Sequence, residues 1–171
     1  ISFTSDMYPK IKDKYKQVFS PQTAYQITSL LEGVVQRGTG KKLNKLKLNI
    51  AGKTGTTNKN TDTWFIGFTS KLVIGVYIGM DDPKPLGRYE TGAKTALPVF
   101  KNFVQKAVKK KDARPFKVAP DIYMMVIESS SGKKANFGSR ETIIEVFKKE
   151  KIENKSIPFS NINDGLNDNN I

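Results

Sequence analysis

Apolar residues recur at helical spacing in the stretch that follows Ser20-Pro21. Serine is favoured just before a helix begins, and proline suits the first helical position. The pattern predicts a helix over residues 20–37 that ends at Gly38-Thr39-Gly40. Its apolar stripe consists of Ala24, Ile27, Leu30, Leu31, Val34 and Val35.

A second stretch, residues 93–109, has the same period and predicts another amphipathic helix. Pro98 lies near its first turn, where proline is tolerated or kinks the helix. The apolar positions are Ala96, Leu97, Phe100, Phe103, Val104, Ala107 and Val108.

Between the two helical segments, three apolar stretches predict consecutive antiparallel strands, with the first at the edge of the sheet. They cover residues 50–57, 63–69 and 72–79, and turn residues separate them. The third stretch has apolar residues at both odd and even positions, so both faces of the strand are apolar. This predicts that both faces are covered. The expected fold class is α+β, an antiparallel sheet with amphipathic helices packed on it.

The rest of the chain is less regular. Residues 1–19 lack a helical period and predict an edge strand or loop. A short strand is expected over 122–127, a turn at 129–132 and a short helix over 141–149. We therefore divide the chain into a main unit (1–112), a small strand, turn and helix extension (113–152) and a loose polar tail (153–171).

Composition removes several kinds of chemistry. The 171 residues include no cysteine and no histidine, which excludes disulfides, Cys/His metal sites and histidine-based catalytic triads. The net charge is +13, but only Arg37, Arg88, Arg114 and Arg140 among the 29 basic residues are arginine. A dedicated nucleic-acid reader usually favours arginine, so we expect no specific nucleic-acid binding.

The segment Gly52-Lys53-Thr54-Gly55-Thr56 falls on the predicted edge strand. Side chains alternate along a strand, so Lys53 and Gly55 face the same way. Glycine leaves room for close approach to the backbone, and an edge strand can pair with an extended peptide. These residues predict a peptide-binding ledge with a cation beside it.

The ordered set of motifs around this strand resembles the transpeptidase domain of the bifunctional (class A) penicillin-binding proteins. The resemblance is strong over about residues 18–105 and weak over 115–150. It rests on Ser20-Pro21, Val35-Gln36-Arg37-Gly38-Thr39-Gly40, Ala51-Gly52-Lys53-Thr54-Gly55-Thr56-Thr57-Asn58, Asp62-Thr63-Trp64-Phe65, Asp81-Asp82-Pro83, Pro85-Leu86-Gly87 and Glu90-Thr91-Gly92.

The resemblance implies roles for the strand residues. Lys53 would support proton movement and the local positive field, and Thr56 would give a backbone N–H to the oxyanion hole. Thr54 and Thr56 would meet the carboxylate of a peptidoglycan stem peptide or a β-lactam, within a substrate-binding set of Thr54, Gly55, Thr56 and Thr57. It implies a parent enzyme at the bacterial inner membrane with this part on the periplasmic side, and no cofactor. We also expect no metal, because adjacent carboxylates such as Asp81-Asp82 on a proline-containing loop are usually solvated.

No segment of the chain is a credible match for the motif that carries the catalytic serine of the family. The family has S-x-x-K and S-x-N motifs upstream of K-T-G. Here S-x-x-K occurs as a string only at residues 130–133 and 131–134, downstream and in a predicted turn, whereas the motif needs a helix. We therefore expect the chain to be part of a longer enzyme and to be inactive without the missing N-terminal half. Alone, it should bind stem peptides and β-lactams weakly or not at all. It should also self-associate through exposed apolar surface.

Alternative interpretations remain beside this one. A phosphate-binding P-loop would need glycine where the chain has Lys47, and a helix after Thr54. A non-catalytic basic module that binds an anionic polymer or a partner surface stays open. We interpret Asp62 as a turn residue, Asp81-Asp82 as solvated, and the aromatic residues Trp64, Phe65, Tyr77, Phe100 and Phe103 as core.

Overall fold

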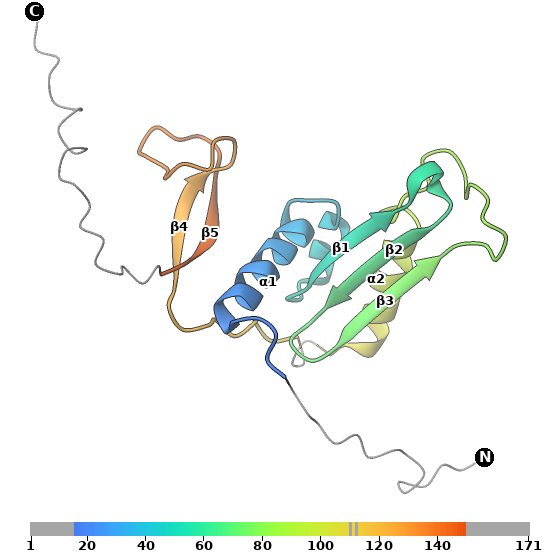
Figure 1. Cartoon of the computed structure of the whole chain (residues 1–171), viewed down its shortest axis with the longest axis horizontal. Helices are drawn as coiled ribbons and strands as arrows, with labels where there is room; N and C mark the ends of the chain where they lie inside the picture. Colours follow the sequence, from blue (N-terminus) through green and yellow to red (C-terminus); the bar gives the residue numbers. More distant parts are fainter. Residues whose placement is uncertain (1–15, 110, 112, 150–171) are drawn as a thin grey trace, which may run out of the picture.

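The computed structural model describes residues 16–109, 111 and 113–149. The elements are α1 (Pro21–Gln36), η2 (Lys41–Leu46), β1 (Ala51–Thr56), η3 (Asn58–Asn60), β2 (Thr63–Phe68), β3 (Val73–Ile78), α2 (Ala96–Ala107), β4 (Ile122–Glu128) and β5 (Thr142–Lys148). Figure 1 shows a sheet of β1, β2 and β3, with α1 beside β1 and the β4–β5 hairpin beyond α1. The predicted α+β class with antiparallel sheets is confirmed.

Helix α1 begins and ends where the sequence predicts. The Thr23 amide donates to Ser20 Oγ at 3.2 Å, which satisfies one of the free amides at the helix start. At the other end, the Gly38 and Gly40 amides both donate to Val34 O, at 3.1 and 3.0 Å. The chain therefore turns back against the last turn of α1 before it enters β1.

Strands β1, β2 and β3 form an antiparallel sheet in that order. Lys53 lies opposite Ile66 and Gly55 lies opposite Trp64. Among the residues that the structure describes, β1 pairs with β2 and with no other strand, so the predicted edge position of β1 is confirmed.

The core lies between this sheet and α2 and extends to the end of α1 and to η2. Phe65 and Phe100 are fully buried, and their rings meet edge to face with centroids 4.7 Å apart. A Cβ at Gly67 would come within 2.7 Å of the Phe100 ring, so glycine is needed for α2 to lie this close. The buried cluster comprises Val35, Leu43, Ile50, Phe65, Ala96, Leu97, Phe100 and Val104.

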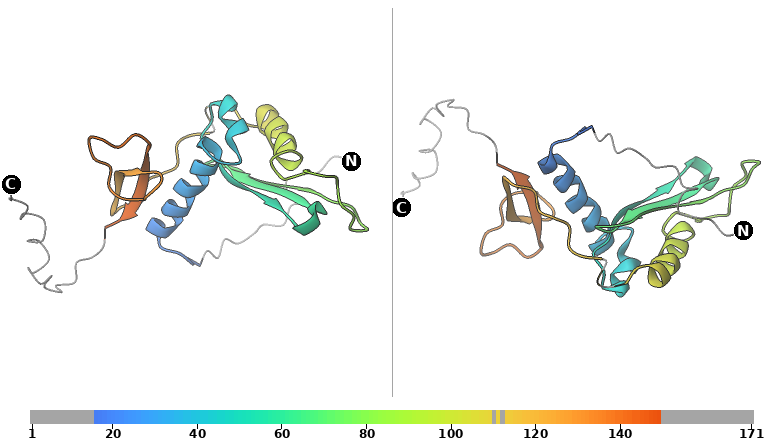
Figure 2. Two further views of the ribbon diagram at one scale, coloured as in Figure 1. Left: turned by 90° about the horizontal axis from the view of Figure 1, so that it is seen from above. Right: turned by 90° about the horizontal axis from the view of Figure 1, so that it is seen from below.

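The prediction that both faces of β3 are covered is wrong. Ile74, Val76 and Ile78 pack against the core, but Val73 on the other face is 71% exposed. Ile66 on β2, which lies opposite Gly75 on the same face, is 51% exposed. Figure 2 shows α2 on one face of the sheet and no described helix over the β2–β3 part of the opposite face. The expectation that Trp64 and Tyr77 are core residues is also wrong, because both lie on this open face.

The predicted helix over 141–149 is also wrong, because the chain forms β5 there and pairs antiparallel with β4. Opposing apolar pairs across the hairpin, such as Tyr123 with Phe147 and Ile127 with Ile143, stabilise the two strands. A short helix over 141–149 would lack these pairs. The hairpin docks on α1, where Arg37 pairs with Glu145 at 2.6 Å. The predictions for residues 1–15 and for the polar tail lie outside the described residues.

Candidate functional site

Lys53 lies on β1, at the edge of the sheet, with its side chain exposed. Its Nζ donates to Thr54 O at 2.9 Å and lies 3.5 Å from Thr54 Oγ1. Backbone N–H and C=O groups alternate between the two edges of a strand, so those of Thr54 and Thr56 share one edge. The Thr57 amide donates to Asp62 O on the β2 side, so the backbone groups of Thr54 and Thr56 point to the opposite, outer edge. Lys53 Nζ therefore lies at Thr54 O on the edge that also carries the N–H of Thr56.

Thr54 is held from outside the sheet. Its Oγ1 lies 2.9 Å from Oγ1 of Thr39, the central residue of the turn that follows α1. The two hydroxyls are 15 residues apart in sequence, and the return of the chain from α1 into β1 brings them together. This pair places a second hydroxyl beside the predicted carboxylate-binding residue.

Thr56 is held by the loop that precedes α2. The Gly92 amide donates to Thr56 Oγ1 at 3.1 Å. A Cβ at residue 92 would come within 2.4 Å of Trp64 O and 2.5 Å of Gly55 O, so only glycine fits against the strand pair. The Thr56 hydroxyl still has its own proton to donate, since here it acts as an acceptor.

Thr57 lies just beyond the end of β1, and its hydroxyl belongs to the turn into β2. It accepts from the Asp62 amide at 2.8 Å and lies 2.8 Å from Thr61 Oγ1. The structure therefore does not bring this hydroxyl beside those of Thr54 and Thr56.

Asp62 anchors the same turn, which agrees with its interpretation as a turn residue. Tyr77 donates to Asp62 Oδ1 at 2.7 Å, and Thr61 donates to Oδ2 at 3.0 Å. The hydrogen bond from Tyr77, followed by that from Thr61, lowers the pKa of Asp62 below its ordinary value. The same hydrogen bond raises the pKa of Tyr77. Through Asp62, the turn after β1 is linked to Tyr77 on β3.

Sequence reasoning missed the contributions of Thr39, Gly92 and Tyr77. Thr39 lies between two glycines, a pattern that predicts a tight turn. The pattern does not predict which residue the Thr39 side chain contacts. Gly92 lies in a glycine- and proline-containing loop, where a glycine needed for close approach looks like any other.

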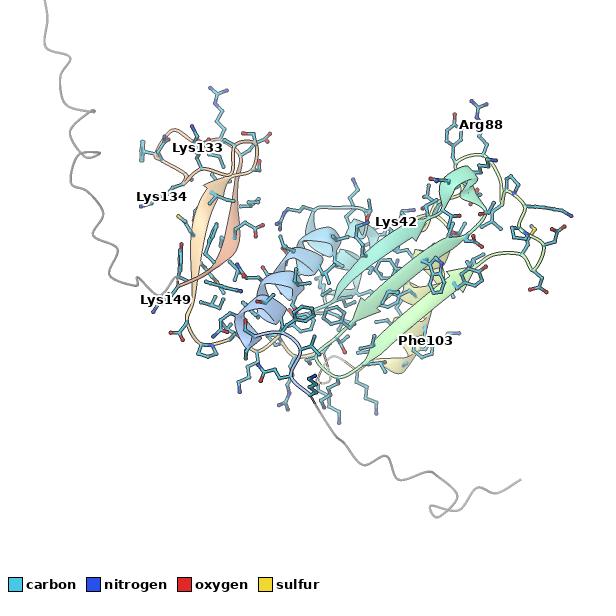
Figure 3. All side chains as sticks on the ribbon, viewed as in Figure 1. Lys42, Arg88, Phe103, Lys133, Lys134 and Lys149 are labelled. Atoms are coloured by element: carbon cyan, nitrogen blue, oxygen red, sulfur yellow. The ribbon has the colours of Figure 1, made fainter. Side chains whose placement is uncertain are left out.

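Basic side chains are distributed over the molecule. Figure 3 shows Lys42, Arg88 and Lys149 in three separate regions. Within residues 16–109, 111 and 113–149, no group of three or more possible metal ligands comes together. No helix in the described part of the chain has the length and apolar character needed to cross a membrane.

Comparison with known proteins gives this arrangement a family. Residues 2–105 match the family described as "Penicillin binding protein transpeptidase domain". Since this match covers more than half of the 171 residues, the chain belongs to the penicillin-binding protein transpeptidase family.

The individual relatives are penicillin-binding proteins 1A. The chain is 45% identical to penicillin-binding protein 1A of Rickettsia conorii over 80% of its length, and 38% identical to that of Pseudomonas aeruginosa over 79%. The crystal structure of penicillin-binding protein 1A from Haemophilus influenzae matches 78% of the chain with a TM-score of 0.69 and 33% identity. The chain spans only 17%, 16% and 21% of these three proteins, respectively.

Proposed function

We propose that this chain supplies the substrate-binding strand and part of the oxyanion hole of a peptidoglycan D,D-transpeptidase. The observation that supports this most directly is Lys53-Thr54-Gly55-Thr56 on an edge strand, with the Lys53 ammonium at the strand rim. The class of enzyme follows from membership in the transpeptidase family. Peptidoglycan stem peptides and β-lactams are the proposed ligands.

Each residue has a role that its surroundings permit. An extended peptide pairs with the edge of β1 that no described strand occupies, and the Lys53 charge attracts its terminal carboxylate. The hydroxyls of Thr54 and Thr56 donate to that carboxylate, while the Thr56 N–H donates to the developing oxyanion. Gly55 leaves the strand open to the ligand, and Thr57 contributes by fixing the end of the strand. Loss of one oxyanion donor typically costs about 100-fold to 1,000-fold in rate.

The serine nucleophile comes, in this proposal, from residues outside the 171. The two S-x-x-K strings include Ser130, Ser131 and Lys133 in the turn between β4 and β5, where no helix aligns serine with lysine. The chain alone therefore binds a carboxylate-bearing ligand weakly and forms no acyl-enzyme. The complete enzyme would act on the periplasmic side of the inner membrane.

A chimaeric domain tests this function. The chain is joined through its N-terminus to the upstream half of the transpeptidase domain of the Rickettsia conorii relative, with which it is 45% identical over the matched region. Both the chimaera and the chain alone are incubated with a fluorescent β-lactam and analysed by denaturing mass spectrometry. We expect a covalent adduct on the chimaera and none on the chain.

Lys53→Ala should abolish or strongly reduce labelling of the chimaera, whereas Lys101→Ala on α2 should leave it unchanged. An adduct on the isolated chain would show that the nucleophile lies within the 171 residues. Equal labelling of the Lys53→Ala and Lys101→Ala chimaeras would remove the proposed role of the strand.

A further inference from the structure

The turn between α1 and η2 projects a single side chain from between two glycines. A Cβ at Gly38 would lie 3.0 Å from Val34 Cα, and a Cβ at Gly40 would lie 3.2 Å from Val34 O and from Val35 Cα. Both positions are packed so closely on the end of α1 that a larger residue requires a shift. Thr39, between them, is exposed and directed towards β1, where it meets Thr54.

The hydroxyl of Thr54 has one proton and two lone pairs. Lys53 Nζ, at 3.5 Å, can only donate to Thr54 Oγ1. If Thr39 also donates across its 2.9 Å contact, both lone pairs of Thr54 Oγ1 are occupied and its proton is left for an incoming acceptor. Hydrogen bonds arranged in such a chain polarise and strengthen one another.

We propose that Thr39 is a positioning residue of the carboxylate-binding site: its hydroxyl donates to Thr54 and thereby directs the Thr54 proton towards the carboxylate of the bound peptide or β-lactam. The inference rests on the proposed function, since it concerns the same site. It assigns a role to a residue outside the Lys53-Thr54-Gly55-Thr56 strand.

The test is a titration of the isotope-labelled 171-residue chain with N-acetyl-D-alanyl-D-alanine and with its methyl ester, followed by NMR. Shifts of the amide signals of residues 54–57 report binding. Thr39→Val keeps the shape of the side chain and removes its donor, so it should weaken binding of the acid about threefold to tenfold. Binding of the ester should not change. Thr39→Ser should restore the acid affinity, and Thr28→Val on α1 serves as a matched control.

A second pair of variants guards against a purely structural effect. In a chain that already has Thr54→Val, adding Thr39→Val should cause no further loss, because the two hydroxyls act as one unit. Unchanged affinity of Thr39→Val for the acid overturns the inference, as does equal weakening for acid and ester. Those results leave the proposed function intact if the unsubstituted chain binds the acid at residues 54–57. Failure of the unsubstituted chain to bind the acid there overturns both the proposed weak site and the role of Thr39.

Discussion

Gly92 and Asp62 lie outside the strand that defines the candidate site, yet each controls the geometry of one of its ends. Gly92 contacts the backbones of β1 and β2 and donates to Thr56 Oγ1. Asp62 ties Thr57 and Tyr77 together across the sheet. At the scale of single residues, the site is therefore built by neighbours that never need to touch a ligand.

Substitution of Gly92 by alanine should destabilise the fold. The added Cβ would press on two carbonyl oxygens at 2.4 and 2.5 Å, and backbone atoms cannot move aside as a flexible side chain can. We expect a loss of about 1–3 kcal/mol in the free energy of unfolding, measured by urea denaturation. Gly75→Ala on β3 is the control, because the nearest atom to its Cβ is 4.0 Å away. Equal denaturation midpoints for the two variants would contradict this account.

The Asp62–Tyr77 contact makes stability depend on pH in the acidic range. Hydrogen bonds lower the folded-state pKa of Asp62 below its ordinary 3.8, so the ionised carboxylate stabilises the fold above that value. The stabilisation is lost as the pH falls through the folded-state pKa. Tyr77→Phe should raise the pKa of Asp62 towards 3.8, measured by NMR of the carboxyl carbon.

The matched control for that titration is Tyr123→Phe on β4, whose ring stacks on Phe147 away from Asp62. An Asp62 pKa that is the same in the Tyr77→Phe variant and the unsubstituted chain would show that this hydrogen bond is not its cause.

At the scale of elements, helices with a clear apolar period and an obvious start were predicted closely, and α1 and α2 agree with expectation to within a few residues. The secondary structure of residues 141–149 was predicted incorrectly, because a short apolar run fits a helix or a strand equally well. Pairing with β4 decides the matter, and that pairing depends on residues about 20 positions earlier.

Helix α2 offers a direct test of which apolar positions hold it on the sheet. Phe100 is fully buried against Phe65 and Gly67, whereas Phe103, labelled in Figure 3, is 50% exposed. Phe100→Ala should lower the free energy of unfolding by about 3–5 kcal/mol, because it leaves a cavity in the core. Phe103→Ala should cost much less. Similar losses of stability for both variants would contradict the difference in burial between Phe100 and Phe103.

At the scale of the whole molecule, apolar side chains are exposed on one face of the sheet and on α1. Val73, Ile66, Trp64 and Tyr77 share one face of the sheet, and Ile27 and Leu30 on α1 are also exposed. The four sheet residues lie on neighbouring paired strands, and contiguous apolar surface of this kind commonly forms interfaces. We propose that in a longer enzyme the rest of the transpeptidase domain covers this surface, and that in the 171-residue chain it favours self-association.

This association should be measurable by light scattering as a mass that rises with protein concentration. Ile66→Thr together with Val73→Thr should shift the equilibrium towards monomer. Ile144→Thr serves as the control, since Ile144 is 63% exposed on the separate β4–β5 hairpin. A monomeric unsubstituted chain over the whole concentration range would refute the proposal.

The sequence by itself determined the two helices, the three-stranded meander, the edge position of Lys53 and the family resemblance. These features depend on local periods, capping residues and motif spacing, all of which are written in neighbouring positions. Only the tertiary structure decided which face of β3 is open, that residues 142–148 form a strand, and that Thr39 and Gly92 hold Thr54 and Thr56. Those outcomes depend on contacts between residues distant in sequence, which no local pattern encodes.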